Sequence, residues 1–363
     1  MRNKKAVVAG HICLDMTPLF PADSRGRPEE LLQPGKLLRM DGVDVHTGGS
    51  VANTGLAMAF FGAQVRLMGK IGEDAFGKMV LDILQHHGCT GEGMIVVPDA
   101  VTSYSVVLAL PGQDRMFLHA PGANDTFACS DVNFDVVKDA ALFHFGYPPL
   151  MRRMYENDGE ELVALLRRVK ELGVATSLDM AAVDPASEAG KVNWRAILQK
   201  LMPYVDFFLP SAEELCFMLD RPRWESWMAR GASDVTDTLD MAQDVKPLAQ
   251  EVLDMGCGVA VIKCGAKGLY YQTSAQVSAL CCGDWAQREG FQMAFAPERI
   301  CSATGAGDTC IAAFLTAMLD GRGLEDCLAL AAAAGSACVE AYDALSGLRS
   351  FAVLEETKIG RKE

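Results

Sequence analysis

The chain has 363 residues, of which 50% are hydrophobic and 22% are charged, and its formal net charge is -14 at pH 7. This length allows a large buried core, and the composition is that of a globular protein. The negative charge argues against nucleic acid or an anionic membrane as a partner, because both would repel the chain.

Short apolar runs alternate with helical patterns along most of the chain. Strands are predicted at residues 6–9, 65–68, 141–145, 174–178, 205–209 and 259–262. Helices are predicted at residues 51–61, 75–87, 160–172, 194–202, 213–219 and 239–255. Several of the strand-like runs are apolar on both faces, as in strands that helices cover on two sides. The βαβ order therefore predicts an α/β fold with a mostly parallel central sheet.

Two segments, 16–47 and 101–119, interrupt this rhythm with alternating patterns typical of half-buried strands. Pro111-Gly112 indicates a hairpin turn in the second segment. We expect both to form a small β-sheet lid inserted into a single domain that spans residues 1–363. The exposed edge of such a lid favours pairing with a second copy, which gives a homodimer. Residues 220–238 are predicted to form a surface insertion.

No apolar run reaches the length of about twenty residues that a membrane span needs, and the apolar stretch after residues 1–5 is too short for a signal peptide. The twelve cysteines are scattered without a Cys-x-x-Cys pair. Both observations lead us to expect reduced thiols and a cytoplasmic protein.

Residues 302–309, Ser-Ala-Thr-Gly-Ala-Gly-Asp-Thr, precede an apolar helical pattern. A Gly-Ala-Gly turn at a helix start leaves backbone N–H groups unpaired, and the helix dipole adds positive charge there. Asp308 places a carboxylate beside this anion site. That position suits a base that takes a proton from a group attacking a phosphate; the alternative is a simple helix cap.

Two more features suit a polyol. Gly48-Gly49 enters a predicted helix, and Asn53 in its first turn offers both a donor and an acceptor. Asp15 closes the first predicted strand, where ligands gather in open parallel sheets, and can accept two neighbouring hydroxyl hydrogens. A plain helix start and a solvated loop acid are the alternatives.

Two nucleotide-binding motifs are excluded. No Gly-x-Gly-x-x-Gly follows any predicted strand, which disfavours a dinucleotide-dependent dehydrogenase. Residues 72–79 approach a Walker A loop, but Met79 lacks the hydroxyl that magnesium needs, and Glu73-Asp74 would repel phosphates.

Taken together, Gly48-Gly49-x-x-x-Asn53 and Thr304-Gly305-Ala306-Gly307-Asp308 resemble the two signatures of the ribokinase-like (PfkB) carbohydrate kinases, in the same order and at a similar separation. The resemblance spans essentially the whole chain. It implies a three-layer α/β/α fold with a β lid, and transfer of the γ-phosphoryl group of ATP to a hydroxyl of a sugar or nucleoside.

The resemblance also implies roles for individual residues. Asp308 matches the catalytic base, and the anion-hole positions are Gly305, Ala306 and Gly307. The acceptor's hydroxyls are expected at Asp15, Gly48, Gly49 and Asn53. His119 joins them because the stretch around it is polar. ATP is expected at Ser211, Lys263, Gly265, Gly268 and Thr304. Glu214 is expected to organise Mg²⁺.

Four positions depart from the family pattern. Ser211 replaces the usual Asn, and Cys13 stands where ribokinases have an Asn that touches the sugar. Ser302 and Asp343 replace an Asp and a Gly near the monovalent-cation loop, which argues against potassium activation. A sugar kinase is favoured, with a nucleoside kinase or a non-catalytic binding protein of the same fold as alternatives.

Overall fold

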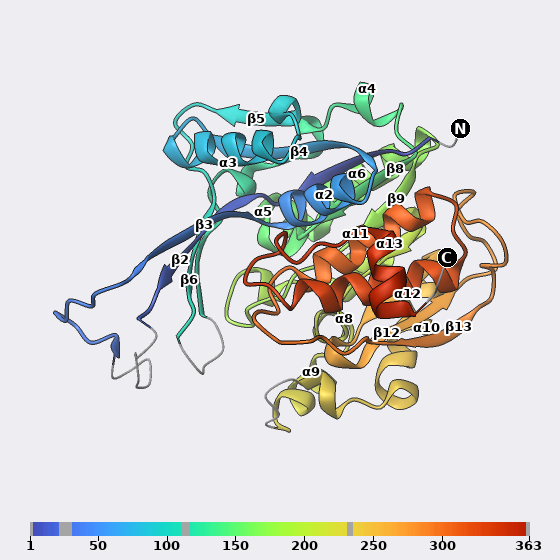
Figure 1. The fold of residues 1–363 in the computed structure, drawn as a ribbon. Helices are drawn as coiled ribbons and strands as arrows, with labels where there is room; N and C mark the ends of the chain where they lie inside the picture. The colour runs from blue at the N-terminus through green and yellow to red at the C-terminus, as the bar shows by residue number, and fades with distance from the viewer. Residues whose placement is uncertain (1–2, 22–30, 111–115, 231–234, 361–363) are drawn as a thin grey trace.

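A nine-stranded sheet forms the centre of the computed structural model, which describes residues 3–21, 31–110, 116–230 and 235–360 (Figure 1). Its strands lie in the order β13-β12-β11-β10-β9-β8-β1-β4-β5. In chain order they are β1 (Lys5–Gly10), β4 (Gln64–Gly72), β5 (Met94–Val97), β8 (Leu142–Gly146), β9 (Ala175–Leu178), β10 (Phe207–Phe208), β11 (Val259–Lys263), β12 (Gly268–Thr273) and β13 (Glu289–Met293). The pairs from β5 to β11 are parallel, and β12 and β13 are added antiparallel at one edge.

Helices cover both faces of this sheet. One face packs on α2 (Ser50–Phe60), α3 (Ala75–His86), α11 (Ala306–Leu319), α12 (Leu324–Cys338) and α13 (Phe351–Leu354). The other face packs on α4 (Phe134–Val137), α5 (Arg152–Tyr155), α6 (Glu160–Glu171), α7 (Trp194–Leu201), α8 (Ala212–Leu219), α9 (Arg221–Met228) and α10 (Lys246–Asp254). Strand β1 shows why both faces are covered: Ala6 and Val8 pack into one hydrophobic core, and Val7 and Ala9 pack into the other. The predicted three-layer α/β/α arrangement is confirmed.

A separate four-stranded sheet has the order β3-β2-β6-β7 and extends away from the helices in Figure 1. Its strands are β2 (Cys13–Leu19), β3 (Gly42–Gly48), β6 (Tyr104–Leu108) and β7 (Met116–Ala120). Both interrupting segments contribute to it, as predicted. The antiparallel pairing of β6 and β7 confirms the hairpin, although its turn, with Pro111-Gly112, lies outside the described residues.

Three predictions of local structure need correction. Asp15 does not close β1; it lies inside β2 of the small sheet, because the first strand ends at Gly10. The helix predicted at 239–255 is shorter: α10 begins at Lys246, with Pro247 in its first turn, after a separate turn of π-helix at Met241–Val245. Within the segment 220–238, Trp227 is fully buried, so the segment is not simply a surface insertion.

All twelve cysteines are free thiols. None of the helices in the described part of the chain is long and apolar enough to cross a bilayer.

Candidate active site

The carboxyl ends of the parallel strands bring together polar residues that are far apart in the sequence. His11 follows β1, Tyr147 follows β8, Asp179 follows β9, Ser211 lies beyond β10, and Lys263 ends β11. In open α/β sheets this edge is where ligands bind. The N-termini of α2 and α11 complete the candidate site, because Asn53 and Thr54 of α2 donate hydrogen bonds to Asp308 of α11.

The first turn of α11 has the form expected for an anion site. Gly305 is the residue before the helix and has a φ of 76°, a left-handed conformation that favours glycine. A Cβ at this position would lie 2.2 Å from Cβ of Ala344. Gly307 lies in the first turn, where backbone N–H groups have no partner within the helix. The expectation of three unpaired amides is wrong for Ala306, whose N–H donates to the Ala303 carbonyl at 3.3 Å.

Asp308 is buried and accepts three side-chain hydrogen bonds. Asn53 Nδ2 donates to Oδ2 at 3.0 Å, Thr54 Oγ1 to Oδ1 at 3.1 Å, and Tyr147 Oη to Oδ2 at 2.7 Å. Burial raises the pKa of the Asp308 carboxyl above its ordinary value, while these hydrogen bonds and the charge of Lys263 oppose the shift. Asp308 is therefore a desolvated carboxylate held by neutral donors, a state suited to accepting a proton.

Lys263 supplies positive charge beside this carboxylate. Its Nζ lies 2.7 Å from Oδ1 of Asp179, and both side chains are largely buried. The lysine side chain runs along Gly307, where an added Cβ would lie 3.5 Å from its Cε. Burial opposes the charge, but Asp179 and Glu214 raise the pKa of Lys263, so it stays protonated. Burial also raises the pKa of Asp179, and the attraction of Lys263 opposes this shift.

Register within the small sheet aligns Asp15 with further polar groups. Asp15 on β2 is opposite Ser105 on β6, which is opposite His119 on β7. Ser105 Oγ and His119 Nδ1 are 3.1 Å apart, and Cys13 Sγ donates to Asp15 Oδ1 at 3.2 Å. Burial raises the pKa of Asp15 and lowers that of His119, although each group attenuates the shift of the other. The result is a row of hydrogen-bonding groups on one face of the small sheet.

Gly48 and Gly49 allow the backbone to pass close to these side chains. A Cβ on Gly48 would lie 2.1 Å from Asp15 Oδ2, and one on Gly49 would lie 2.6 Å from His11 Nδ1. His11 is fully buried, and burial lowers its pKa to about 3, so the ring is neutral. Neither ring nitrogen has a hydrogen-bond partner among the described residues. An unpartnered buried imidazole of this kind is costly in a protein interior unless a ligand or water completes it.

Ser211, which is expected to bind nucleotide, forms an isolated parallel β-bridge with Lys263. Ser211 Oγ accepts from the Glu214 N–H at 3.1 Å, and Glu214 Oε2 accepts from the Ser211 N–H at 2.7 Å. This capping box at the start of α8 fixes Glu214 but uses only one of its two carboxylate oxygens. Gly265 and Gly268 form the tight turn between β11 and β12, and Thr304 precedes α11. Among the described residues no cluster of three or more ligand side chains could hold a metal ion.

Four residues of this cluster were not predicted from the sequence. Three of them follow predicted strands: His11, Tyr147 and Asp179. The fourth, Thr54, is next to Asn53. The position of a polar residue just after a buried strand was the available signal.

The fold is also found in several sugar kinases of known structure. The structure of Arabidopsis thaliana ribokinase complexed with ribose and ATP superposes with a TM-score of 0.73 at 21% identity, covering 98% of both chains. The structure of a Xylella fastidiosa fructokinase with bound ATP gives a TM-score of 0.71 at 18% identity, again covering 98% of both chains. The protein is thus an α/β protein of the ribokinase fold.

Sequence comparison identifies the family. A model of the pfkB family carbohydrate kinases matches residues 4–350, so the chain belongs to this family. It is 26% identical over 313 residues to a probable fructokinase-5 of Arabidopsis thaliana, a match covering 83% of this chain and 84% of that protein. It is 25% identical over 355 residues to a ribokinase of the same plant, covering 96% of this chain and 81% of that protein. The predicted family and the classification as a carbohydrate kinase are confirmed.

Proposed function

We propose that the protein transfers the γ-phosphoryl group of ATP to a hydroxyl of a small sugar, with Asp308 as the base. The observation that carries this proposal is the position of Asp308. Asp308 lies in the first turn of α11, among the backbone amides that would face a phosphate. It accepts a hydrogen bond from Asn53, which belongs to the signature expected to bind the acceptor. One carboxylate thereby joins the two halves of the site.

Phosphoryl transfer needs positioning, charge neutralisation and a base within reach of the attacking hydroxyl. Asp308 takes the proton of the acceptor hydroxyl as the hydroxyl oxygen attacks the γ-phosphorus, and the bond from that phosphorus to the β–γ bridging oxygen breaks, so that ADP leaves. The backbone N–H groups of Gly305 and Gly307, with Lys263, stabilise the charge on the transferring group. A backbone anion hole of this kind contributes about 3–4 kcal/mol of transition-state stabilisation.

The acceptor is held by Asp15, Gly48, Gly49, Asn53 and His119, and we add His11 to this group. His11 and His119 have ring centroids 5.2 Å apart, and a neutral imidazole can both donate to and accept from a hydroxyl. These donors and acceptors suit a polyol. The curated relatives, fructokinases and a ribokinase, favour a sugar over a nucleoside.

Glu214 fits a role toward Mg²⁺, because its capping contact leaves one carboxylate oxygen for the metal or its water. Mg²⁺ typically binds through one or two carboxylates together with substrate phosphates, so a dedicated cage is not required. When bound, the metal would neutralise phosphate charge. The nucleotide would bind next to the metal, in contact with Ser211, Gly265, Gly268 and Thr304.

The small sheet is proposed to act as a lid over the acceptor and as a contact between two copies of the chain. A closed lid excludes water and so prevents wasteful hydrolysis of ATP. Val43, Phe117 and Leu118 on this sheet are 57%, 55% and 59% exposed, and a second copy would cover them. Light scattering of the purified chain, with Phe117→Ser as the comparison, tests the dimer; a monomeric wild type would contradict it.

The activity is tested by measuring ADP release with a panel of pentoses, hexoses and nucleosides, and by finding the added phosphate on the acceptor by mass spectrometry. The proposal predicts turnover with a sugar. Turnover with nucleosides but with no sugar would show that the acceptor is a nucleoside. Acceptor binding without any phosphorylated product would show a binding protein.

A further inference from the structure

Tyr147 makes the shortest of the three hydrogen bonds to Asp308. Its Oη lies 2.7 Å from Oδ2, closer than Asn53 Nδ2 at 3.0 Å or Thr54 Oγ1 at 3.1 Å. A short O–H···O⁻ bond to a desolvated carboxylate is among the stronger hydrogen bonds found in proteins. Removing it changes how Asp308 is held and how it is charged.

The backbone of Tyr147 is strained. Its φ of 64° and ψ of 41° lie in the left-handed region, which is rare for a bulky residue. Pro148 follows, and the residue before a proline favours an extended conformation. Such strain clusters at functional sites and persists only where the surrounding structure enforces it.

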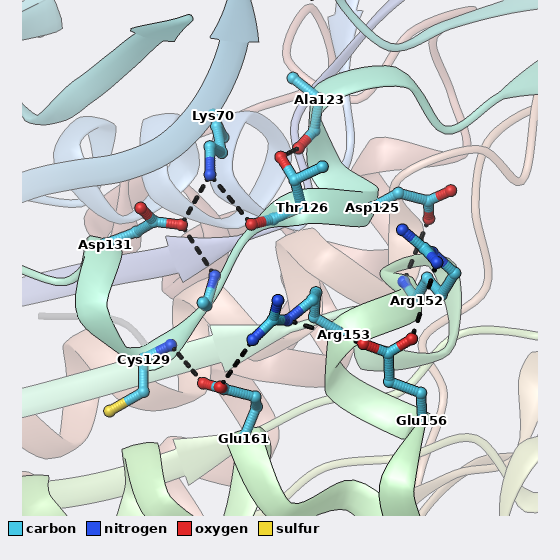
Figure 2. Close-up of polar contacts among 11 residues, drawn as sticks. Lys70, Ala123, Asp125, Thr126, Cys129, Asp131, Arg152, Arg153, Glu156 and Glu161 are labelled. Carbon is cyan, nitrogen blue, oxygen red and sulfur yellow. Dashed lines mark hydrogen bonds and ion pairs between the residues drawn. The ribbon is translucent and has the colours of Figure 1, made fainter.

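The segment after Tyr147 is anchored at several points, as Figure 2 shows. The Arg152 N–H donates to Asp125 Oδ1 at 3.1 Å, and Arg153 forms an ion pair with Glu161 at 3.0 Å. Next to Asp125, Asn124 hydrogen-bonds the Ile12 backbone at 2.8 Å through its Nδ2. Residues 124 and 125 therefore fix both the chain that carries His11 and the chain that follows Tyr147.

The donors also divide unequally between the two carboxylate oxygens. Asn53 and Tyr147 both donate to Oδ2, and Thr54 donates to Oδ1. A carboxylate has about four acceptor positions, two on each oxygen. The described side-chain contacts thus fill Oδ2 and leave capacity on Oδ1.

We propose that Tyr147 is a positioning residue that holds Asp308 ionised and leaves Oδ1 as the atom that receives the acceptor's proton. This rests on the proposed role of Asp308 as base. Tyr147 does not itself take the proton: burial, then the nearby charges of Asp308 and Asp179, raise the pKa of its hydroxyl, which remains a donor. The ring centroid of His11 lies 6.1 Å from that of Tyr147, so His11 lies between Tyr147 and the residues proposed to bind the acceptor.

Tyr147→Phe tests this inference, because it keeps the ring and removes only the hydroxyl. A donor that stabilises the carboxylate lowers its pKa, so its loss should move the acid limb of the kcat/KM profile to higher pH by about one unit. At neutral pH we expect kcat to fall about tenfold. Tyr155→Phe on α5 is the matched control, with an acid limb equal to that of the wild type.

A second measurement does not require turnover. Because burial already raises the Asp308 pKa in the folded state, stability associated with this group is lost as the pH rises through that pKa. Tyr147→Phe raises the pKa further, so its deficit in unfolding free energy relative to wild type should be larger at pH 7 than at about pH 4. A purely structural loss would give equal deficits.

If the wild type phosphorylates a sugar, the acid limb decides, and a Tyr147→Phe limb that coincides with the wild-type limb overturns the inference whatever the rate. If the wild type phosphorylates nothing, the proposed function fails. The two stability deficits then decide whether Tyr147 stabilises the charged carboxylate, and equal deficits overturn that claim.

Discussion

Asn53 and Asp308 lie 255 positions apart in the sequence, and Nδ2 of Asn53 donates to Oδ2 of Asp308 across 3.0 Å. This hydrogen bond links the first turn of α2, which follows Gly48-Gly49, to the first turn of α11. The helix starts of the two family signatures therefore meet at one carboxylate. Under the proposed function, this contact brings the acceptor and the phosphate within reach of the same base.

Asn53→Asp places a second carboxylate against Asp308 with almost no change in shape. We expect the like charge to raise the Asp308 pKa, and turnover at neutral pH to fall about a hundredfold. The activity should partly recover as the pH rises. A kcat/KM profile measures this effect.

Asn193→Asp is the control for that substitution. Asn193 caps α7 at an exposed position, where aspartate caps equally well. It should leave the profile unchanged. An Asn53→Asp enzyme with the wild-type profile would show that the Asn53–Asp308 contact has no part in catalysis.

Lys263→Met removes the cation beside Gly307. We expect ATP affinity to fall about tenfold or more, because phosphate charge loses its buried partner, while sugar affinity is retained. Calorimetric titration with each ligand separates the two effects. Lys170→Met on α6, which breaks the 2.8 Å ion pair between Lys170 and Asp206, is the control and should leave ATP affinity intact. Unchanged ATP binding in Lys263→Met would contradict the assigned role.

Gly305→Ala introduces two problems at the start of α11: a side chain at a φ of 76°, and a Cβ within 2.2 Å of the Ala344 Cβ. We expect a loss of about 1–3 kcal/mol of unfolding free energy, together with reduced turnover. Urea denaturation measures the loss. Adding Ala344→Gly should restore part of it by removing the steric overlap. Wild-type stability of the single variant would show that the turn adapts without cost.

Much of the large sheet could be predicted from sequence for a physical reason. Strands such as β1 and β11 are buried on both faces, so they appear as continuous apolar runs that no solvent-facing residue interrupts. The glycine-containing signatures at the starts of α2 and α11 could be recognised in the sequence, because close approach of an anion or ligand to the backbone restricts which residue types fit there.

Other features depended on tertiary structure. Asp15 was placed after β1 because Ile12 and Leu14 extend the apolar pattern, whereas the chain leaves the large sheet at Gly10. Tyr147 and Asp179 have no local motif and reach the site only because β8 and β9 end at the same edge. Their pairing with Asp308 and Lys263 is a property of the fold.

The central claim is that Asp308 takes the acceptor's proton, and Asp308→Asn tests it most directly. Steady-state ADP release with the preferred sugar, measured alongside ATP binding to the same variant, gives the answer. The account predicts ATP affinity close to wild type and a loss of about a thousandfold in kcat. Near-normal kcat in this variant would contradict it.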